Sequence, residues 1–131
     1  MKIIITQWAL DAYLDLKHTN VISQSYYQEQ LRPDALLLRN YLGDPKFANG
    51  KFWSPASLNN QIIPHGYKMK WHQVGSGRMQ LRLPVTIMHE AYLCQGYIKH
   101  DEKTEKRLLA KFKTHCQLIE EGRFIQCGEL Q

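Results

Sequence analysis

The chain lacks the features that mark secreted, membrane-spanning or metal-binding proteins. Its 131 residues include three cysteines, Cys94, Cys116 and Cys127, and no CxxC pair. The simplest interpretation of three widely spaced cysteines is that all three are reduced thiols. The apolar runs, such as Ile3–Ile5 and Ala35–Leu38, are too short to span a bilayer or to serve as a signal peptide. We therefore expect a cytoplasmic protein with no membrane partner.

Acidic residues are missing from one long stretch. Between Pro45 and His89 there is no Asp or Glu, although the chain holds twelve. The same stretch is rich in basic side chains, namely Lys46, Lys51, His65, Lys68, Lys70, His72, Arg78, Arg82 and His89. A positive electrostatic field attracts phosphates, and the net charge of +5 also favours a nucleic-acid partner. A solvated basic surface without a ligand is the alternative.

Motifs for metal-dependent or nucleotide-dependent chemistry are also missing. No cluster of carboxylates suggests a metal nuclease, and Gly75–Gly77 lacks the flanking residues of a phosphate-binding loop. Ser54 and Ser76 stand in no recognisable hydrolase motif. We expect no metal and no cofactor.

The N-terminal third predicts a strand followed by helices. Lys2–Thr6 is a β-branched run, and residues 7–17 have helical apolar spacing. Asn20 or Ser23 can cap a second helix that runs to about Leu31; we expect Pro33 to interrupt it, and residues 34–42 to restart it. Residues 44–66 are rich in Pro, Gly, Ser and Asn. They predict a long loop with at most a short strand near Phe52-Trp53.

Residues 67–83 predict a β-hairpin with one apolar and one basic solvent face. Tyr67, Met69 and Trp71 alternate with Lys68, Lys70 and His72, and after the turn Gly75–Gly77, Met79, Leu81 and Leu83 alternate with Arg78, Gln80 and Arg82. A loop over residues 73–77 would place Lys68 opposite Arg82 and His72 opposite Arg78. A slip of two residues would leave the two faces unchanged.

The rest of the chain predicts a third strand and a terminal helix. Residues 90–98 read as a buried strand, Asp101 can cap a helix that ends at Gly122, and residues 123–127 can form one more strand. The expectation is a single α+β domain over residues 1–131. Its N-terminal strand and helices would pack on a small antiparallel sheet, with a helix at the C-terminus.

The basic face has the residue types that metal-free RNA cleavage needs. RNA supplies its own nucleophile, the 2′-hydroxyl, so the protein must take a proton, stabilise charge on the phosphorus and return a proton to the leaving oxygen. Lys68, Lys70 or His72 can be the base, and Arg can stabilise the charge. His72 or His100 can be the acid. Tyr97, Trp53 and Phe52 would stack on bases if exposed, although binding without cleavage would explain the same residues.

The order of elements and three short motifs resemble the RelE/ParE toxin superfamily. The motifs are Tyr67-Lys68-Met69-Lys70, the turn Ser76-Gly77-Arg78, and the segment 96–101 (GYIKHD) followed by residues 102–107. The resemblance implies a RelE-like toxin that cuts mRNA in the ribosomal A site and is silenced by an antitoxin protein. It implies that Lys68 and Lys70 are base and charge stabiliser and that Arg78 holds the scissile phosphate. Lys99, His100 or Lys103 would supply a further basic or acidic group, and Tyr97 would stack on a base.

Three functions stay open from the sequence. The first is a metal-independent endoribonuclease toxin with catalytic Lys68, Lys70, Arg78 and His100, and with RNA-binding residues His72, Arg82, Tyr97, Lys99 and Lys103. The second is a ParE-like toxin that binds DNA gyrase without cutting RNA. The third is a basic RNA-binding or protein-interaction domain of unrelated descent.

Overall fold

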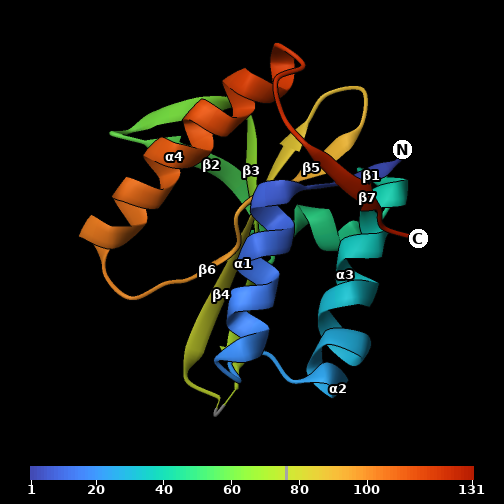
Figure 1. Cartoon of the computed structure of the whole chain (residues 1–131), viewed down its shortest axis with the longest axis vertical. Helices are drawn as coiled ribbons and strands as arrows, with labels where there is room; N and C mark the ends of the chain where they lie inside the picture. The colour runs from blue at the N-terminus through green and yellow to red at the C-terminus, as the bar shows by residue number, and fades with distance from the viewer. Residues whose placement is uncertain (76) are drawn as a thin grey trace.

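One mixed sheet with helices on both faces forms the centre of the molecule (Figure 1). The computed structural model describes residues 1–75 and 77–131. Within them, the sheet strands are β1 (Ile3–Thr6), β2 (Trp53–Leu58), β3 (Gln61–Val74), β4 (Met79–Ile87), β5 (Ala91–Leu93), β6 (Tyr97–Ile98) and β7 (Gln126–Glu129). They lie in the order β2-β3-β4-β5-β1-β7, and β6 pairs with β4. All pairs are antiparallel except β1 with β5.

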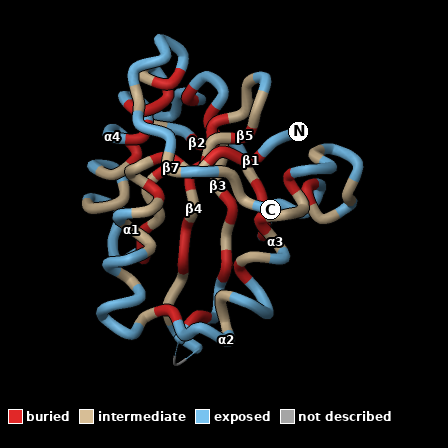
Figure 2. Tube along the Cα trace, turned by 45° about the vertical axis from the view of Figure 1, so that its right-hand side comes forward, coloured by how far each residue is buried: buried red, intermediate tan, exposed pale blue. Residues whose placement is uncertain are grey.

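The helices divide between the two faces of the sheet. Helix α1 (Gln7–His18) and the helical segment 24–40 pack on one face, where the larger apolar core gathers around Met69, Trp71 and Leu81. Helix α4 (Glu102–Glu120) covers part of the other face with Leu109, Phe112 and Ile119. Figure 2 shows buried residues along β3 and β4, between these layers. None of the helices in residues 1–75 and 77–131 combines the length and apolar character that a bilayer span requires.

The mixed α and β content agrees with the sequence prediction, but the sheet is more extensive than expected. Its parallel pair joins β1 to β5, and the strand that the sequence allowed over residues 123–127 forms at residues 126–129 as β7, which pairs with β1. The predicted strand over residues 90–98 is divided into β5 and β6, which pair with different neighbours. Residues 94–96 belong to neither strand. They carry the chain from β5, which pairs with residues 85–87 of β4, to β6, which pairs with Leu81 and Arg82 of the same strand.

Pro33 does not interrupt the second helical segment, contrary to the prediction. The segment runs through α2 (Gln24–Tyr26), a π-helical turn η1 (Tyr27–Leu31), α3 (Arg32–Leu36) and a 3-10 turn η2 (Leu37–Asn40). Ser23 caps its start by accepting from the Tyr26 amide. The π turn, in which the Arg32 amide donates to the Tyr27 carbonyl, lies immediately before Pro33. The wider turn leaves room for the proline ring, which would clash in a regular helix interior.

The long loop predicted over residues 44–66 is largely regular structure. It contains the 3-10 turn η3 (Pro45–Ala48), all of β2 and the first part of β3. Asn59 and Asn60 both have positive φ (53° and 63°), as a two-residue hairpin turn requires. Pro55 is tolerated because β2 is an edge strand, and Pro64 lies where the β2–β3 register shifts. The residues that predicted a loop therefore form a hairpin of β2 and β3 with an irregular register.

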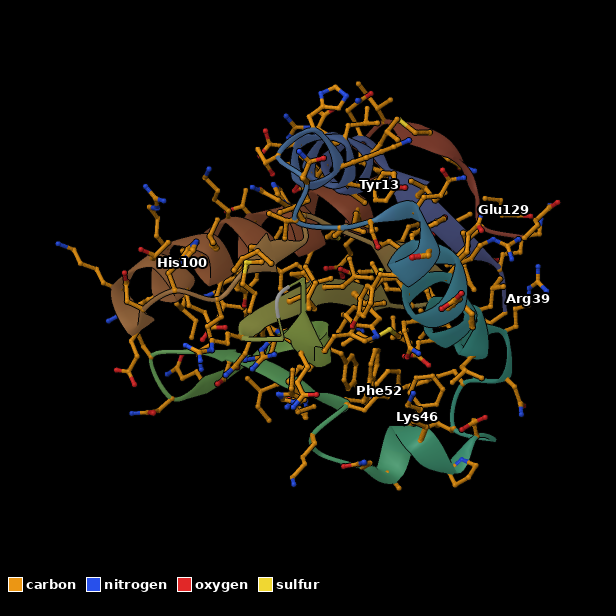
Figure 3. All side chains as sticks on the ribbon, turned by 90° about the horizontal axis from the view of Figure 1, so that it is seen from below. Tyr13, Arg39, Lys46, Phe52, His100 and Glu129 are labelled. Atoms are coloured by element: carbon orange, nitrogen blue, oxygen red, sulfur yellow. The ribbon has the colours of Figure 1, made fainter. Side chains whose placement is uncertain are left out.

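Aromatic side chains and one carboxylate fix η3 and β2 against the sheet. Trp53 stacks on Tyr67 with ring centroids 5.0 Å apart, and Lys46 lies over the Phe52 ring (Figure 3). The Asp34 carboxylate accepts from the Trp71 indole at 2.8 Å and from Lys46 Nζ at 2.7 Å. Phe52 and Trp53 are buried, so neither is available to stack on a base as the sequence allowed.

Thr6 joins helix α1 to strand β5 through one buried hydroxyl. Its Oγ1 accepts from the Ala9 amide at 3.3 Å as the helix cap and donates to the Leu93 carbonyl at 2.6 Å. Thr6→Ala is therefore expected to lower the free energy of unfolding by about 2 kcal/mol, since it removes the helix cap and a second buried hydrogen bond. Denaturant titration measures the loss, and Thr6→Ser, which keeps the hydroxyl, is the control. Equal stability of Thr6→Ala and the unsubstituted chain would contradict this account of the cap.

Candidate nucleic-acid interface

The strand register aligns basic residues across three strands. Lys70 of β3 pairs with Arg82 of β4, and Arg82 pairs in turn with Tyr97 of β6. Lys68 lies opposite Pro84, so the register differs by two residues from the one drawn from the sequence. Because paired residues share a face, Lys68, Lys70 and Arg82 still project from the same side of the sheet. The predicted turn includes Ser76, which is outside the described residues.

Glu105 in the first turns of α4 gathers this face into one cluster. Its carboxylate accepts a hydrogen bond from the Tyr97 hydroxyl at 2.7 Å. The same carboxylate lies 4.0 Å from Lys68 Nζ and 3.8 Å from Lys99 Nζ. We call Lys68, Lys70, Arg82 and Lys99, with Glu105 among them, the basic cluster. Two of the four cations contact the carboxylate, and the cluster as a whole keeps an excess of positive charge.

Arg82 is buried within the cluster, which corrects the expectation of a fully solvent-exposed basic face. Only 5% of its surface is exposed. One of its guanidinium nitrogens donates to the Gln80 side chain at 2.7 Å, and the other contacts the Leu81 carbonyl at 3.4 Å. Neither partner is an anion. A guanidinium has five N–H donors, and it binds phosphate oxygens well when it is held in a fixed orientation.

Burial and mutual repulsion lower the pKa values of the two strand lysines. For Lys68, burial is the largest cause, and Arg82 and Lys99 lower the pKa further, while Glu105 raises it. For Lys70, burial again leads, followed by Lys68, Arg82 and Lys99. A lowered pKa enlarges the neutral fraction of an amine near neutral pH, and a neutral amine can accept a proton.

The connection from η3 to β2 contributes backbone carbonyls to the edge of the cluster. Lys70 Nζ donates to the Gly50 carbonyl at 2.6 Å, and His72 Nε2 contacts the Lys51 carbonyl. A carbonyl only accepts, so Nε2 carries the proton of the neutral His72 ring and Nδ1 is its free nitrogen. His72 is exposed and lies two residues from Lys70 on the same face of β3.

Two of the four predicted catalytic residues lie away from the basic cluster. Arg78, which the resemblance implied for holding the phosphate, is exposed in the turn before β4, and Arg82 is the arginine that lies opposite Lys70. His100 lines a hollow with Asp15 and Thr19 of α1, whereas Lys99, its neighbour, contacts Glu105. Within residues 1–75 and 77–131, no hydrogen bond joins the His100 side chain to Lys68 or Lys70.

The predicted RNA-binding residues divide in the same way. His72 and Lys99 lie at the edge of the cluster and are exposed, and Lys103 is exposed on the first turn of α4. Tyr97 is only 6% exposed, and its hydroxyl donates to Glu105. Tyr97 therefore cannot stack on a base, and it orients Glu105 instead.

Glu105 is the residue that the sequence analysis missed. Acidic residues near a helix start are explained by the helix dipole, so the pattern gave no reason to assign Glu105 another role. The signal that could have found it is its position one turn after Asp101, the residue that caps α4 through the Thr104 amide. That position places Glu105 beside Tyr97, which closely precedes the helix.

The cluster can hold a phosphate through Arg82 and Lys70, and it can offer the Lys68 amine as a base. In the described ranges, no group of three or more His, Cys, Asp or Glu side chains is arranged to bind a metal ion. No family model, curated protein or solved structure matches this chain, so the argument for its function rests on the chemistry of the basic cluster.

Proposed function

We propose that the chain is a metal-independent endoribonuclease that cuts mRNA and acts as the toxin of a toxin–antitoxin pair, with a RelE-like domain. The observation that carries the nuclease proposal is the cluster at one face of the sheet, where Lys68 and Lys99 contact Glu105 and Lys70 pairs with the buried Arg82. Like charges across a sheet repel, and Glu105 offsets only one of the four positive charges of the cluster. The remaining positive charge favours a bound anion, and a phosphodiester supplies one.

The proposed reaction follows the positions of the side chains. Lys68, as the neutral amine, takes the proton of the 2′-hydroxyl, and the 2′-oxygen attacks the adjacent phosphorus. Arg82 and Lys70 stabilise the negative charge that develops on the phosphorane oxygens. Protonated His72 donates a proton to the 5′-oxygen as the P–O bond breaks. The products are a 2′,3′-cyclic phosphate and a free 5′-hydroxyl.

Lys68 is preferred to Lys70 as the base for a geometric reason. The Lys70 ammonium donates at 2.6 Å to the Gly50 carbonyl, and a hydrogen bond from the charged form favours that form. Within the part of the chain that the structure describes, the polar contact of Lys68 Nζ is the 4.0 Å one with Glu105, and the Lys68 side chain is 18% exposed. Lys70 is thus suited to hold a phosphate oxygen, and Lys68 is suited to lose a proton.

The partners follow from the resemblance of the motifs in residues 67–70 and 96–101. They are mRNA, the ribosome on which a RelE-like toxin works, and an antitoxin protein. RNA binding without cleavage is the second candidate function, and the contacts of Glu105 favour it. The Glu105 carboxylate neutralises part of the positive charge of the cluster, so it weakens the attraction for a polyanion and keeps binding reversible.

Induced expression in bacteria tests the proposal. We expect the unsubstituted chain to arrest growth and to create new 5′ ends within translated codons, and the double variant Lys70→Ala/Arg82→Ala to do neither. Lys113→Ala/Lys111→Ala, on exposed positions of α4, is the matched control for loss of charge. Arrest with intact mRNA would reject cleavage and favour a gyrase-binding toxin. RNA binding without arrest would leave the second candidate.

A further inference from the structure

An apolar cavity lies on the face of the sheet opposite the basic cluster. Its volume is about 210 Å³, and it is enclosed by α1, the helical segment that contains α3, and the strands beneath them. Trp71, Leu81 and Leu93 form the strand side of its wall, and Ala9, Leu31 and Ala35 are among the helix side. All six are buried. Because Trp71 and Leu81 alternate with Lys70 and Arg82 along their strands, the cavity and the basic cluster face opposite ways.

The cavity lies between the two helical segments and the strands beneath them. Figure 1 shows α1 and α3 side by side over the strands, and Figure 3 shows Tyr13 on the α1 side of the molecule. Tyr13 and Tyr27, one from each helical segment, line the cavity with their ring centroids 5.0 Å apart. Both tyrosines are half-buried, so part of each side chain is exposed to solvent beside the cavity.

Arg32 gives the lining its one positive charge. The side chain is half-buried and lines the cavity together with Tyr27 and Leu31. Among the described residues, no hydrogen bond or ion pair engages its guanidinium. Asp34, the acid nearest to it in sequence, is already held by Lys46 and the Trp71 indole. An unpaired guanidinium beside an apolar wall recruits an anion whose remaining atoms are apolar.

The volume of the cavity sets the size of the apolar part of such a ligand. A dry apolar cavity of about 150 Å³ binds benzene, and a water molecule in the liquid takes about 30 Å³. A methylene group takes a similar space, so a cavity of about 210 Å³ holds roughly seven carbons. Cavities of this size that stay empty cost stability, because their lining atoms have no partners on one side.

We propose that this cavity binds a small amphipathic carboxylate, an aliphatic or aromatic acid of roughly six to ten carbons. The apolar part lies against Leu81, Leu93 and Ala35, and the carboxylate pairs with the Arg32 guanidinium. This site is separate from the basic cluster, and it neither requires nor supports RNA cleavage.

Isothermal titration of the full chain with hexanoate, octanoate and decanoate tests the proposal. Each added methylene should strengthen binding about fourfold until the cavity is full, because burial of one methylene is worth that factor. Octanol and octylamine, which match octanoate in length, should bind at least about tenfold more weakly, since a hydrogen bond to a charged partner contributes that much. Nuclear Overhauser effects from the octanoate chain to the methyl groups of Leu81 and Leu93 should locate the ligand.

Two kinds of variant test separately the role of the Arg32 charge and the role of the cavity volume in octanoate binding. Arg32→Gln should reduce octanoate affinity to that of octanol, and Arg39→Gln, an exposed arginine on the same helical segment, should leave it unchanged. Ala35→Leu fills the cavity and should abolish binding while it keeps or raises the melting temperature. Ala9→Leu fills it from α1 if the first variant fails to fold. The proposal is overturned if octanoate does not bind the unsubstituted chain, if octanol binds as tightly, or if a folded cavity-filling variant binds normally.

Discussion

Arg82→Ala should lower the rate of RNA cleavage by about 10²–10³-fold, the loss typical when one group that stabilises transition-state charge is removed. Arg82 is 5% exposed and pairs with Lys70 and Tyr97 across the sheet, so the phosphate that it would hold lies within the basic cluster. A rate assay on a short RNA that contains one cleavable site measures the effect. The loss should fall mainly on the maximal rate, because Lys70 and Lys99 still bind substrate.

Arg78→Ala is the matched comparison, since it removes the same side chain from the same strand region. Arg78 is exposed in the turn before β4, and we expect the cleavage rate to stay within about threefold of the unsubstituted value, as for loss of one peripheral phosphate contact. Arg82→Lys keeps the charge but not the planar donor fork, so it should recover only part of the rate. A larger loss with Arg78→Ala than with Arg82→Ala would reject the assignment of Arg82.

The comparison of Arg78 with Arg82 also shows how much of the site the alternation of residues along the strands could predict. Alternation along residues 67–72 and 78–83 predicted which side chains share a face, and the structure places Lys68, Lys70 and Arg82 together on that face. Alternation carries no information on register. The register depends on where the ladder shifts between Trp71 and Val74, and that shift moved Arg82 opposite Lys70 and left Arg78 in the turn.

Long-range contacts were beyond the sequence for the same reason. Glu105 reaches the cluster because β6 pairs with β4 and α4 starts shortly after β6, and neither fact is visible in local periodicity. The burial of Tyr97 follows from the same packing. The hairpin of β2 and β3 was missed because Pro55 and Pro64 were interpreted as loop residues, whereas an edge strand and a bulge tolerate proline.

Apolar periodicity predicted the helices better than it predicted the sheet. Helix α4 begins after its Asp101 cap as expected, and its buried stripe includes Leu109, Phe112 and Ile119. That stripe covers only part of its face of the sheet, and Glu105 lies nearer the start of the helix. The helix thus seals one end of the face with apolar side chains and leaves the lysines accessible at the other.

Replacement of the proposed base should have the largest effect on the chemistry. Lys68→Arg keeps the positive charge but cannot lose its proton near neutral pH, so we expect cleavage to fall by about 10²–10⁴-fold. Lys70→Arg, which keeps a charged donor to the phosphate, should cost much less. The reverse order of the two losses would assign the base to Lys70.

The pH dependence of cleavage tests the same assignment through the surroundings of Lys68. Burial, Arg82 and Lys99 lower the Lys68 pKa below its ordinary value of 10.5, so the rising limb of the pH–rate profile, which reports the base, should lie below 10.5. Glu105 raises that pKa, so Glu105→Gln should move the rising limb to lower pH. The same substitution removes a negative charge from the cluster, so it should also tighten RNA binding. A rising limb that stays in place with Glu105→Gln would show that the amine beside this carboxylate is not the base.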